Sequence, residues 1–331
     1  MSLSPTAPTQ TTSAPNAVSI IIPVKNGLPY FRDVCAALKT QIYDAPIEVI
    51  CIDSGSKDGS DQIALDHGFR LVRIPSAEFG HGRSRNKAAS LATGEYLVFL
   101  THDAIPNDPH WLAQLVAPMR HDPDVAGVFS RHIAHEGADP FITWELQEHF
   151  RGLGNFALVQ ITDRARYDSD LGLRQVYHYY SDNASAMPRR IWETHPYPDV
   201  QFAEDQIWAK TIVEAGYKKA FAIGSVVRHS HAFGPWATLR RSFDESRAFN
   251  KLFGYELCTS WSNAAKSSAY LFKRDIGNAF KYGWWRTHPV KTVSRMLESF
   301  ARPVGHYLGC RKNLPKWLEN RISLDEWIKS L

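Results

Sequence analysis

The sequence has few cysteines and spaces them widely. Its four cysteines, Cys35, Cys51, Cys258 and Cys310, form no C-x-x-C pair. The pattern therefore disfavours a disulfide framework and a cysteine-ligated zinc site, and the cytoplasm is the expected compartment. The sequence also contains no internal repeat and no Gly-rich signature after its first predicted strand, which argues against a nucleotidyltransferase.

Long apolar runs are missing as well. The longest are residues 17–24 and 96–100, whereas a helix that crosses a bilayer needs about 20 apolar residues. Residues 1–17 consist mainly of Ser, Thr, Pro, Ala and Asn, without a basic cluster or an apolar core. This composition predicts a disordered tail and not a signal peptide.

Charge is divided unevenly along the chain. The 331 residues have a formal net charge of only +4. From Phe233 onward, 17 Lys and Arg stand against 8 Asp and Glu, which gives this part +9 and leaves −5 for the first 232 residues. Six of the ten Trp also lie after residue 232. The length predicts one large domain with an appendage, and we place them at residues 18–232 and 233–331, the latter basic, Trp-rich and helical.

Apolar runs alternate with helical stripes over the first 120 residues. The expected strands comprise residues 18–24, 48–52, 69–74 and 95–100. Helices are expected after Pro29, over residues 61–67 and 83–92, and after a cap at Asn107 or Asp108. This alternation predicts an α/β fold with a mostly parallel, doubly wound sheet, helices on both faces, and a C-terminal helical appendage.

Polar residues follow three of the predicted strands. Ligands of parallel sheets bind beyond the carboxyl ends of the strands, because the loops diverge there and helix N-termini present free N–H groups. Taken singly, Asp53 suits an ordinary turn and Asp103 a helix cap. Arg83 and Arg85 suit a solvated surface. Together these residues indicate a crevice for a nucleotide with a metal-bound pyrophosphate.

Several segments resemble a known family. They are Val18-Ser-Ile-Ile-Ile-Pro-Val-Lys-Asn-Gly, Val49-Ile-Cys-Ile-Asp-Ser-Gly-Ser-Lys-Asp-Gly-Ser, Gly94-Glu-Tyr-Leu-Val-Phe-Leu-Thr-His-Asp-Ala, Phe202-Ala-Glu-Asp-Gln-Ile-Trp-Ala-Lys and Arg228-His-Ser-His. In this order they resemble the inverting family 2 glycosyltransferases of the GT-A fold. With Ser181-Asp-Asn-Ala-Ser-Ala-Met, they are most similar to bacterial rhamnosyltransferases of surface-polysaccharide (O-antigen or capsule) assembly.

The resemblance implies a nucleotide-sugar pocket at the strand ends. It assigns to this pocket Pro23, Asn26, Asp53, Ser54, Arg83, His102, Asp103 and Asp182. Asp53 takes the position of an acid that reads the pyrimidine or ribose, and Ser54 stands where the family often has a second Asp. Arg83 takes the position of a basic residue that contacts the base or the diphosphate. Residues 101–103 occupy the family's Asp-x-Asp metal motif, of which only the final carboxylate is kept.

The resemblance also implies a divalent metal, Mg²⁺ or Mn²⁺, held by Asp103 with His229 or His231. A hard cation that bridges both phosphates neutralises the charge that develops as the diphosphate leaves. One carboxylate with imidazole ligands favours Mn²⁺. Two His at positions i and i+2 of an extended segment share one face. The alternative is a pair of hydrogen-bonded structural histidines.

The pair Glu204-Asp205 resembles the paired acids of the family. It implies Asp205 as the general base and Glu204 as a supporting ligand or orienting residue. An inverting single displacement needs the base on the face opposite the leaving diphosphate. Alternatively, both acids stabilise the dipole of the helix that contains Trp208, and the two roles are compatible.

Two further regions carry expectations. Residues 139–175 lack clear periodicity and are expected to form loops on the acceptor side. From Trp236 the pattern is helical and amphipathic, and most of its apolar residues are expected to dock on the body or on one another. These residues include Leu239, Phe243, Phe249, Tyr270, Leu271, Phe280, Val293, Met296, Leu297 and Phe300.

The basic residues of the same region have three interpretations. In the first they bind anionic phospholipid, in the second they bind the diphosphate of a lipid-linked acceptor, and in the third they are only solvated. No nucleic acid partner is expected, because no recognition motif is present and a net charge of +4 is a weak electrostatic footprint.

The sequence therefore predicts an inverting, metal-dependent glycosyltransferase attached peripherally to the cytoplasmic face of the inner membrane. Its expected reaction moves L-rhamnose from dTDP-L-rhamnose to a hydroxyl of a lipid-linked saccharide. One alternative is a transferase of the same fold that uses a UDP-hexose. Another is a non-catalytic saccharide-binding or scaffold protein on a degenerate GT-A domain.

Overall fold

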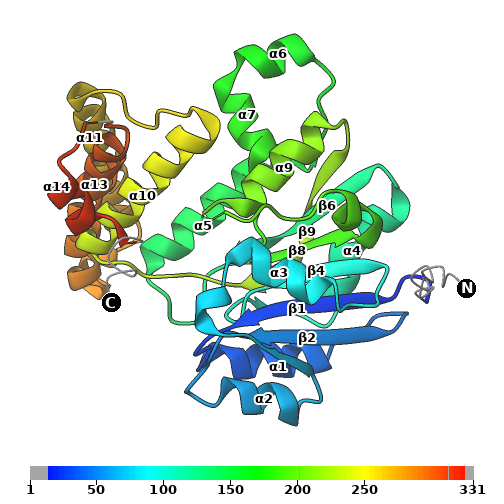
Figure 1. The fold of residues 1–331 in the computed structure, drawn as a ribbon. Coiled ribbons are helices and arrows are strands. Elements are labelled where there is room, and N and C mark those ends of the chain that lie inside the picture. Colours follow the sequence, from blue (N-terminus) through cyan, green and yellow to red (C-terminus); the bar gives the residue numbers. More distant parts are fainter. Residues whose placement is uncertain (1–13, 201, 312, 325–331) are drawn as a thin grey trace, which may run out of the picture. The chain divides into compact units, whose positions relative to one another are not determined.

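The computed structural model describes residues 14–200, 202–311 and 313–324 (Figure 1). The chain divides into two compact units. Unit 1 comprises residues 1–133 and 149–229, and unit 2 comprises residues 134–148 and 230–331. Most of the expected tail, residues 1–17, lies outside the described residues. The domain boundary expected after residue 232 stays a prediction.

Unit 1 is built on a mixed, mostly parallel sheet. Its strands are β1 (Val18–Val24), β2 (Ile47–Asp53), β3 (Arg70–Arg73), β4 (Tyr96–Leu100), β5 (Ile105–Pro106), β6 (Val125–Ile133), β7 (Leu158–Val159), β8 (Ala184–Pro188) and β9 (Lys218–Arg228). They lie in the order β3-β2-β1-β4-β8-β6-β9-β5, and β7 pairs with β9. Strands β1 to β4 pair in parallel, β8 is antiparallel to both of its neighbours, and β6 and β9 are parallel to each other.

The first half of unit 1 confirms the alternation expected from the sequence. Its helices are α1 (Tyr30–Lys39), α2 (Ser60–Asp66), α3 (His81–Ala89) and α4 (Trp111–His121), with a 3₁₀ turn at Ser76–Glu78. Helices α1, α2 and α4 share one apolar core with alternate residues of β1, among them Ile20 and Ile22. The connection from β3 back to β4 crosses β1 and β2, and a right-handed crossover places α3 on the opposite face.

The strand directions bring the predicted site residues to one edge of the sheet. Since β4, β6 and β9 run the same way, the carboxyl ends of these strands and of β1 and β2 lie at one edge. The antiparallel strand β8 brings its amino end, preceded by Asp182, to the same edge. The backbone N–H of Thr101 donates to the Asn183 carbonyl at 3.0 Å, which ties the two segments together.

The expected cap of the fourth helix is wrong. Helix α4 begins at Trp111, its N-cap position is His110, and no side chain caps it. The Asp108 carboxylate instead accepts a hydrogen bond from the His110 N–H at 2.9 Å, in the turn before the helix.

The loops expected over residues 139–175 are also wrong. This region contains α5 (Pro140–Leu153), a 3₁₀ turn at Gly154–Phe156, β7, α6 (Arg164–Ser169) and most of α7 (Leu171–His178). Asp163 and Asp170 cap α6 and α7 by accepting hydrogen bonds from the N–H groups of Arg166 and Leu173, both at 2.9 Å. These local caps start helices that are too short to show a clear apolar period. The remaining helices of unit 1 are α8 (Arg189–Thr194) and α9 (Glu204–Glu214).

Unit 2 is helical, as expected for the C-terminal region. Its helices are α10 (Pro235–Phe253), α11 (Trp261–Lys281), α12 (Trp284–Thr287), α13 (Pro289–Gly309) and α14 (Lys316–Ile322). Helix α13 packs on both α10 and α11 (Figure 1). Helices α10 and α13 approach closely at two glycines. A Cβ at Gly305 would lie 2.4 Å from the Leu239 carbonyl oxygen, and one at Gly309 would lie 2.4 Å from that of Phe243.

Helices α11 and α13 meet through charged and small side chains. The buried Arg295 pairs with the buried Asp275 at 2.8 Å and with Glu145 at 2.9 Å. Arg302 also pairs with Glu145, at 2.6 Å. Burial alone raises the pKa of Glu145, but Arg302 and Arg295 outweigh burial and lower this pKa to about 2.

The expectation that most apolar residues of the C-terminal region dock is wrong for α11 and α13. Phe243 of α10 is buried as expected. Tyr270, Phe280, Val293, Leu297 and Phe300 are exposed instead. The reason is that charged and small residues occupy the contact between α11 and α13. Among the described residues, no helix combines the length and the apolar character that spanning a bilayer requires.

Candidate active site

The loops after β1 and β2 hold each other in place. The Asn26 N–H donates to the Ser56 hydroxyl at 2.9 Å, and the Lys57 N–H donates to Asn26 Oδ1 at 2.8 Å. Asn26 adopts a φ of 49°, a left-handed conformation that Asn tolerates better than most residues. The predicted pocket residues Asn26 and Asp53 therefore belong to one hydrogen-bonded loop cluster.

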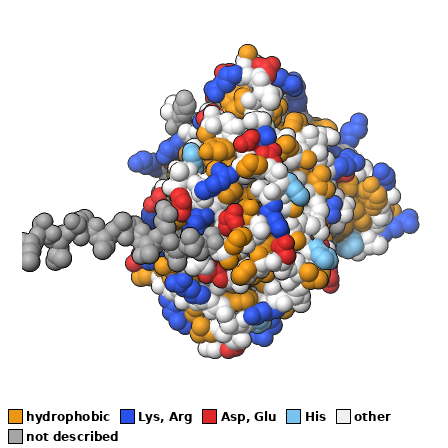
Figure 2. Space-filling model, turned by 90° about the vertical axis from the view of Figure 1, so that its right-hand side faces the viewer, with side chains coloured by type: hydrophobic (Ala, Val, Ile, Leu, Met, Phe, Trp, Pro, Cys, Tyr) orange, Lys and Arg blue, Asp and Glu red, His pale blue; other side chains and the backbone are white. Residues whose placement is uncertain are grey.

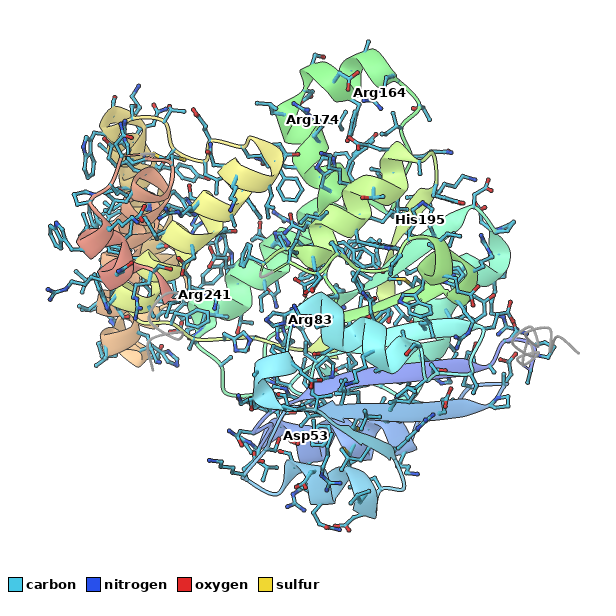
Figure 3. All side chains as sticks on the ribbon, in the orientation of Figure 1. Asp53, Arg83, Arg164, Arg174, His195 and Arg241 are labelled. Carbon is cyan, nitrogen blue, oxygen red and sulfur yellow. The ribbon has the colours of Figure 1, made fainter. Side chains whose placement is uncertain are left out.

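Asp53 directs its carboxylate into its own loop. It accepts from the Gly55 N–H at 3.0 Å, from the Ser56 N–H at 3.2 Å, and from the Ser56 hydroxyl. The neighbouring Ser54 is buried, and its N–H donates to the Val24 carbonyl at 3.1 Å. Asp53 thus shapes the loop at the carboxyl end of β2 (Figure 3), while its role in reading the nucleotide stays a prediction.

His102 follows β4 and contacts the end of β1. Its Nδ1 lies 3.3 Å from the Pro23 carbonyl oxygen, so Nδ1 carries the proton in this contact. The ring also covers Gly27, where a Cβ would lie 3.2 Å from it. The structure thereby brings Pro23 and His102 together, as the pocket prediction requires.

Arg83 lies on the first turn of α3 and is half exposed. Its guanidinium pairs with the Asp199 carboxylate at 2.7 and 3.0 Å. Figure 3 shows Arg83 on the same part of unit 1 as Asp53, whereas Arg164 and Arg174 lie far from both. An exposed ion pair of this kind is worth little, so the contact with Asp199 leaves Arg83 able to exchange it for a phosphate.

Asp103 and His229 of unit 1 could supply ligands to a metal ion, and His231 is a further candidate. Asp103 Oδ2 lies 3.6 Å from His229 Nε2. His229 follows the last residue of β9 and is buried, Asp103 is partly buried, and His231, two residues further along the chain, is exposed. A carboxylate with two imidazoles suits Mn²⁺ better than Mg²⁺.

The buried ring of His132 stands behind His229. The two ring centroids are 5.3 Å apart with the planes nearly perpendicular. Burial, and then the neighbouring His229, lower the pKa of His132 well below its usual value. His132 is therefore neutral and adds no positive charge that would oppose a cation at the cluster.

Three carboxylates surround one buried guanidinium at the same edge of the sheet. Arg85, with 2% of its side chain exposed, pairs with Asp182 at 3.0 Å and with Glu204 at 3.1 Å. The Asp182 N–H donates to Asp205 Oδ2 at 3.4 Å, which places the third carboxylate beside the first. We call Arg85, Asp182, Glu204 and Asp205 the acid cluster.

One positive charge cannot neutralise three carboxylates, and the pKa values reflect this. Burial, and after it the negative charge of Asp182, raise the pKa of Asp205 to about 7. Burial likewise raises the pKa of Asp182 to about 7 against the opposing effect of Arg85. The pKa of Glu204 is also raised, mainly by burial. The cluster therefore holds a proton near neutral pH, and Asp205 retains some access to solvent.

Helix α9 positions the two predicted catalytic acids. Glu204 and Asp205 occupy its first turn, as expected, and Ala203 before them adopts a φ of 58°, which is strained for a residue other than glycine. The buried Trp208 anchors the helix by donating from Nε1 to the His195 carbonyl at 2.8 Å. The Trp208 ring lies over Gly127 of β6, where a Cβ would be 2.6 Å away.

The sequence interpretation gives Arg85 no role of its own and misses its acidic partners. The family resemblance points to the nearby Arg83 instead. The helical period of α3 contained the signal, since Gly82, Arg85, Ala88 and Ala89 share its buried face. An arginine in phase with small residues has to be buried, and a buried arginine needs acidic partners.

The fold and the site define an enzyme class. The carboxyl edge of the α/β sheet combines three features: the hydrogen-bonded loops after β1 and β2, the carboxylate–imidazole cluster, and a carboxylate with a pKa near 7. This combination is suited to group transfer from an activated donor. A solved mannosyltransferase, PcManGT from Pyrobaculum calidifontis in complex with GDP-Man and Mn²⁺, has the same fold. The two superpose with a TM-score of 0.56 at 19% identity, over 88% of this chain and 86% of that one.

Sequence comparisons give the family. The family described as Glycosyl transferase family 2 matches residues 19–187. The O-antigen chain rhamnosyltransferase RfbN of Salmonella typhimurium is 30% identical over 88% of this chain and 89% of its own length. WbaN of Salmonella anatum, with the same description, is 28% identical over 88% of both chains. The chain belongs to glycosyl transferase family 2, and it is a glycosyltransferase with a GT-A-like fold.

Proposed function

We propose that the protein transfers L-rhamnose from dTDP-L-rhamnose, with inversion, to a hydroxyl of a lipid-linked saccharide. Its similarity to two O-antigen chain rhamnosyltransferases over most of the chain supports this donor and this kind of acceptor. A lipid-linked acceptor would bring the enzyme to the cytoplasmic face of the inner membrane.

The observation that carries the proposal is the state of Asp205. Its pKa is raised to about 7, it keeps some access to solvent, and it lies at the same sheet edge as Asp103 and His229. A carboxylate with a pKa near the working pH is deprotonated often enough to accept a proton and basic enough to attract one.

The proposed reaction is a single displacement. The acceptor oxygen forms a bond to the anomeric carbon while the bond from that carbon to the donor diphosphate breaks. Asp205 takes the proton of the attacking hydroxyl, and the diphosphate leaves with the bonding electron pair. Arg85 holds Asp182 and Glu204, and through Asp182 it fixes the position of Asp205.

Asp103, His229 and His231 would hold the divalent metal. When bound, Mn²⁺ or Mg²⁺ would neutralise the negative charge that builds up on the departing diphosphate. Asn26, Asp53, Ser54, His102 and Arg83 would line the nucleotide side of the pocket. Asp103 would then stand between the nucleotide loops and the acid cluster along the sheet edge.

A donor panel tests the proposal without knowledge of the acceptor. The purified protein is incubated with Mn²⁺ or Mg²⁺ and one of dTDP-L-rhamnose, UDP-glucose or GDP-mannose, and the slow release of nucleoside diphosphate is measured. We expect release from dTDP-L-rhamnose above the other two, and faster with Mn²⁺. Preference for UDP-glucose would replace the donor with a UDP-hexose. No release from any donor, with no thermal shift by dTDP or UDP, would favour a saccharide-binding or scaffold protein.

The variant Asp205→Asn separates base catalysis from donor binding. The amide is nearly isosteric but cannot accept the acceptor proton. Transfer to a saccharide acceptor should therefore fall by about 10² to 10⁴-fold, while the thermal shift caused by dTDP and Mn²⁺ stays near that of the wild type. Unchanged turnover would refute the assignment of Asp205 as the base.

A further inference from the structure

Helices α11 and α13 carry apolar stripes on the outside of unit 2. On α11 the stripe consists of Trp261, Ala265, Ala269, Phe272, Ile276 and Phe280. On α13 it consists of Val290, Val293, Leu297, Phe300 and Val304. Residues spaced by three or four positions lie on one side of a helix. Most of the large members are exposed, from 38% for Phe272 to 79% for Val290.

The two stripes form one continuous surface. The rings of Phe272 and Phe300 have centroids 5.8 Å apart and join the stripes across the helix pair. Trp285 of α12 extends the surface, with its ring 5.7 Å from that of Phe280. A groove of about 480 Å³ runs between the helices, lined by Trp261, Phe272, Phe300, Val304 and small residues.

The fold fixes this outward orientation. The inner faces of α11 and α13 hold Asp275 and Arg295, which pair with each other and with further charged groups. Rotating either helix to bury its stripe would expose these pairs or leave a buried charge without its partner, which is strongly unfavourable. The exposed stripes are therefore a property of the packed unit.

The exposed Asp, Glu, Lys and Arg side chains of α11, α12 and α13 are all basic. Residues 261–309 contain two acids, Asp275, which is buried, and Glu298, which is bound by Arg295 and Ser294. The exposed bases of the same stretch are Lys266, Lys273, Lys281, Arg286 and Lys291. Four of them, Lys273, Lys281, Arg286 and Lys291, directly follow a large apolar residue of the surface in the sequence. The face of the molecule in Figure 2 mixes both signs of charge, in contrast to this stretch.

We propose that the apolar surface of α11, α12 and α13 inserts into the interface of an anionic lipid bilayer. The aromatic and aliphatic side chains enter the boundary between headgroups and acyl chains, and the adjoining Lys and Arg bind anionic headgroups. Five like charges would repel each other across a symmetric contact between two copies of the chain, which favours the bilayer as the occupant. The inference rests on the proposed function only in that a lipid-linked acceptor lies at the same surface.

Vesicle flotation tests the proposal with the full chain and no nucleotide sugar. The partition coefficient is measured on vesicles of phosphatidylglycerol and phosphatidylcholine, and on pure phosphatidylcholine, at low and high salt. We expect binding to the anionic vesicles that weakens with salt. The double variant Leu297→Ser/Phe300→Ser should lower the partition coefficient at least about ten-fold. Lys273→Glu/Lys281→Glu should remove the preference for anionic lipid.

The matched control is Ile42→Ser, which changes an equally exposed apolar residue of unit 1 (59% exposed) and should bind as the wild type does. Thermal unfolding of each variant, followed by circular dichroism, verifies that it folds. Wild-type protein that ignores anionic vesicles, or a Leu297→Ser/Phe300→Ser variant that binds them fully, would overturn the proposal. So would a dimer in gel filtration that this variant converts to a monomer, because a second copy would then cover the surface. Donor hydrolysis in the absence of lipid, measured in parallel, reports separately on the proposed function.

Discussion

At the scale of single residues, the acid cluster is governed by an imbalance of charge. Arg85 pairs with Asp182 and Glu204 directly, while Asp205, among the residues that the structure describes, accepts hydrogen bonds from the backbone N–H groups of Asp182 and Gln206. The residue that receives the least positive charge is therefore the one proposed to take the proton. Part of this arrangement was readable from sequence, because Glu204-Asp205 matched a family motif. The role of Arg85 was not, because its partners lie 97 and 119 residues away.

The charge imbalance predicts the pH dependence of transfer. Asp205 must be deprotonated to act as a base, so kcat/KM should rise with pH through about 7. Asp182→Asn removes the neighbouring negative charge that raises the pKa of Asp205, and should move this rise to lower pH. The remote variant Asp168→Asn on α6 serves as the control and should leave the profile in place. A profile that Asp182→Asn does not move would show that the two carboxylates are not coupled.

At the scale of elements, strands and helices differ in how visible they are in sequence. Strands β1, β2 and β4 are mostly apolar and rich in Val, Ile and Leu, and the sequence predicts their bounds to within one residue. Strand β8, Ala-Ser-Ala-Met-Pro, lacks β-branched residues, and only its pairing with β4 and β6 makes it a strand. Likewise, the stripes of α11 and α13 were visible, but not that charged residues on their inner faces turn them outward.

Substituting alanine for either of two glycines of unit 2 should change the free energy of unfolding in opposite directions. A Cβ at Gly309 would collide with the Phe243 carbonyl oxygen and push α10 from α13, so Gly309→Ala should lower the free energy of unfolding by about 1–3 kcal/mol. Gly277 lies within α11 with open space around it. Gly277→Ala should raise the free energy of unfolding by about 0.5–1 kcal/mol, because alanine loses less backbone entropy in a helix.

Urea unfolding curves of both variants measure these changes. Equal effects of the two substitutions would contradict the close approach of α10 and α13.

At the scale of the whole molecule, the two units respond to pH in opposite directions. In unit 1 the pKa values of Asp182 and Asp205 are raised from 3.8 to about 7, so the folded unit binds more protons than the unfolded chain between these values. Their contribution to stability is present below about pH 4 and is lost as the pH rises to about 7. In unit 2 the pKa of Glu145 is lowered from 4.5 to about 2, and its contribution is lost as the pH falls through that range.

Buried cysteines report on each unit separately. Cys51 lies in unit 1 and Cys258 in unit 2, and both are buried. Labelling with dithiodipyridine in a urea series gives, for each cysteine, the urea concentration at which half of it has reacted. For Cys51 this midpoint should decrease as the pH is raised from 4 to 8. For Cys258 it should decrease as the pH is lowered from 4 to 3. Each pKa unit corresponds to about 1.4 kcal/mol at most, and parallel shifts of both midpoints would contradict the assignment.

The antiparallel strand β8 also sets the order in which the candidate site can assemble. During synthesis, β4 and β6 leave the ribosome before β8, which must then insert between them. Until it does, both strands present open hydrogen-bonding edges, and Arg85 has met neither of its acidic partners. The insertion closes the sheet, delivers Asp182 and precedes the arrival of Asp205 and His229. The candidate site is thus complete only after β8 has inserted and residues 204–229 have followed it along the chain.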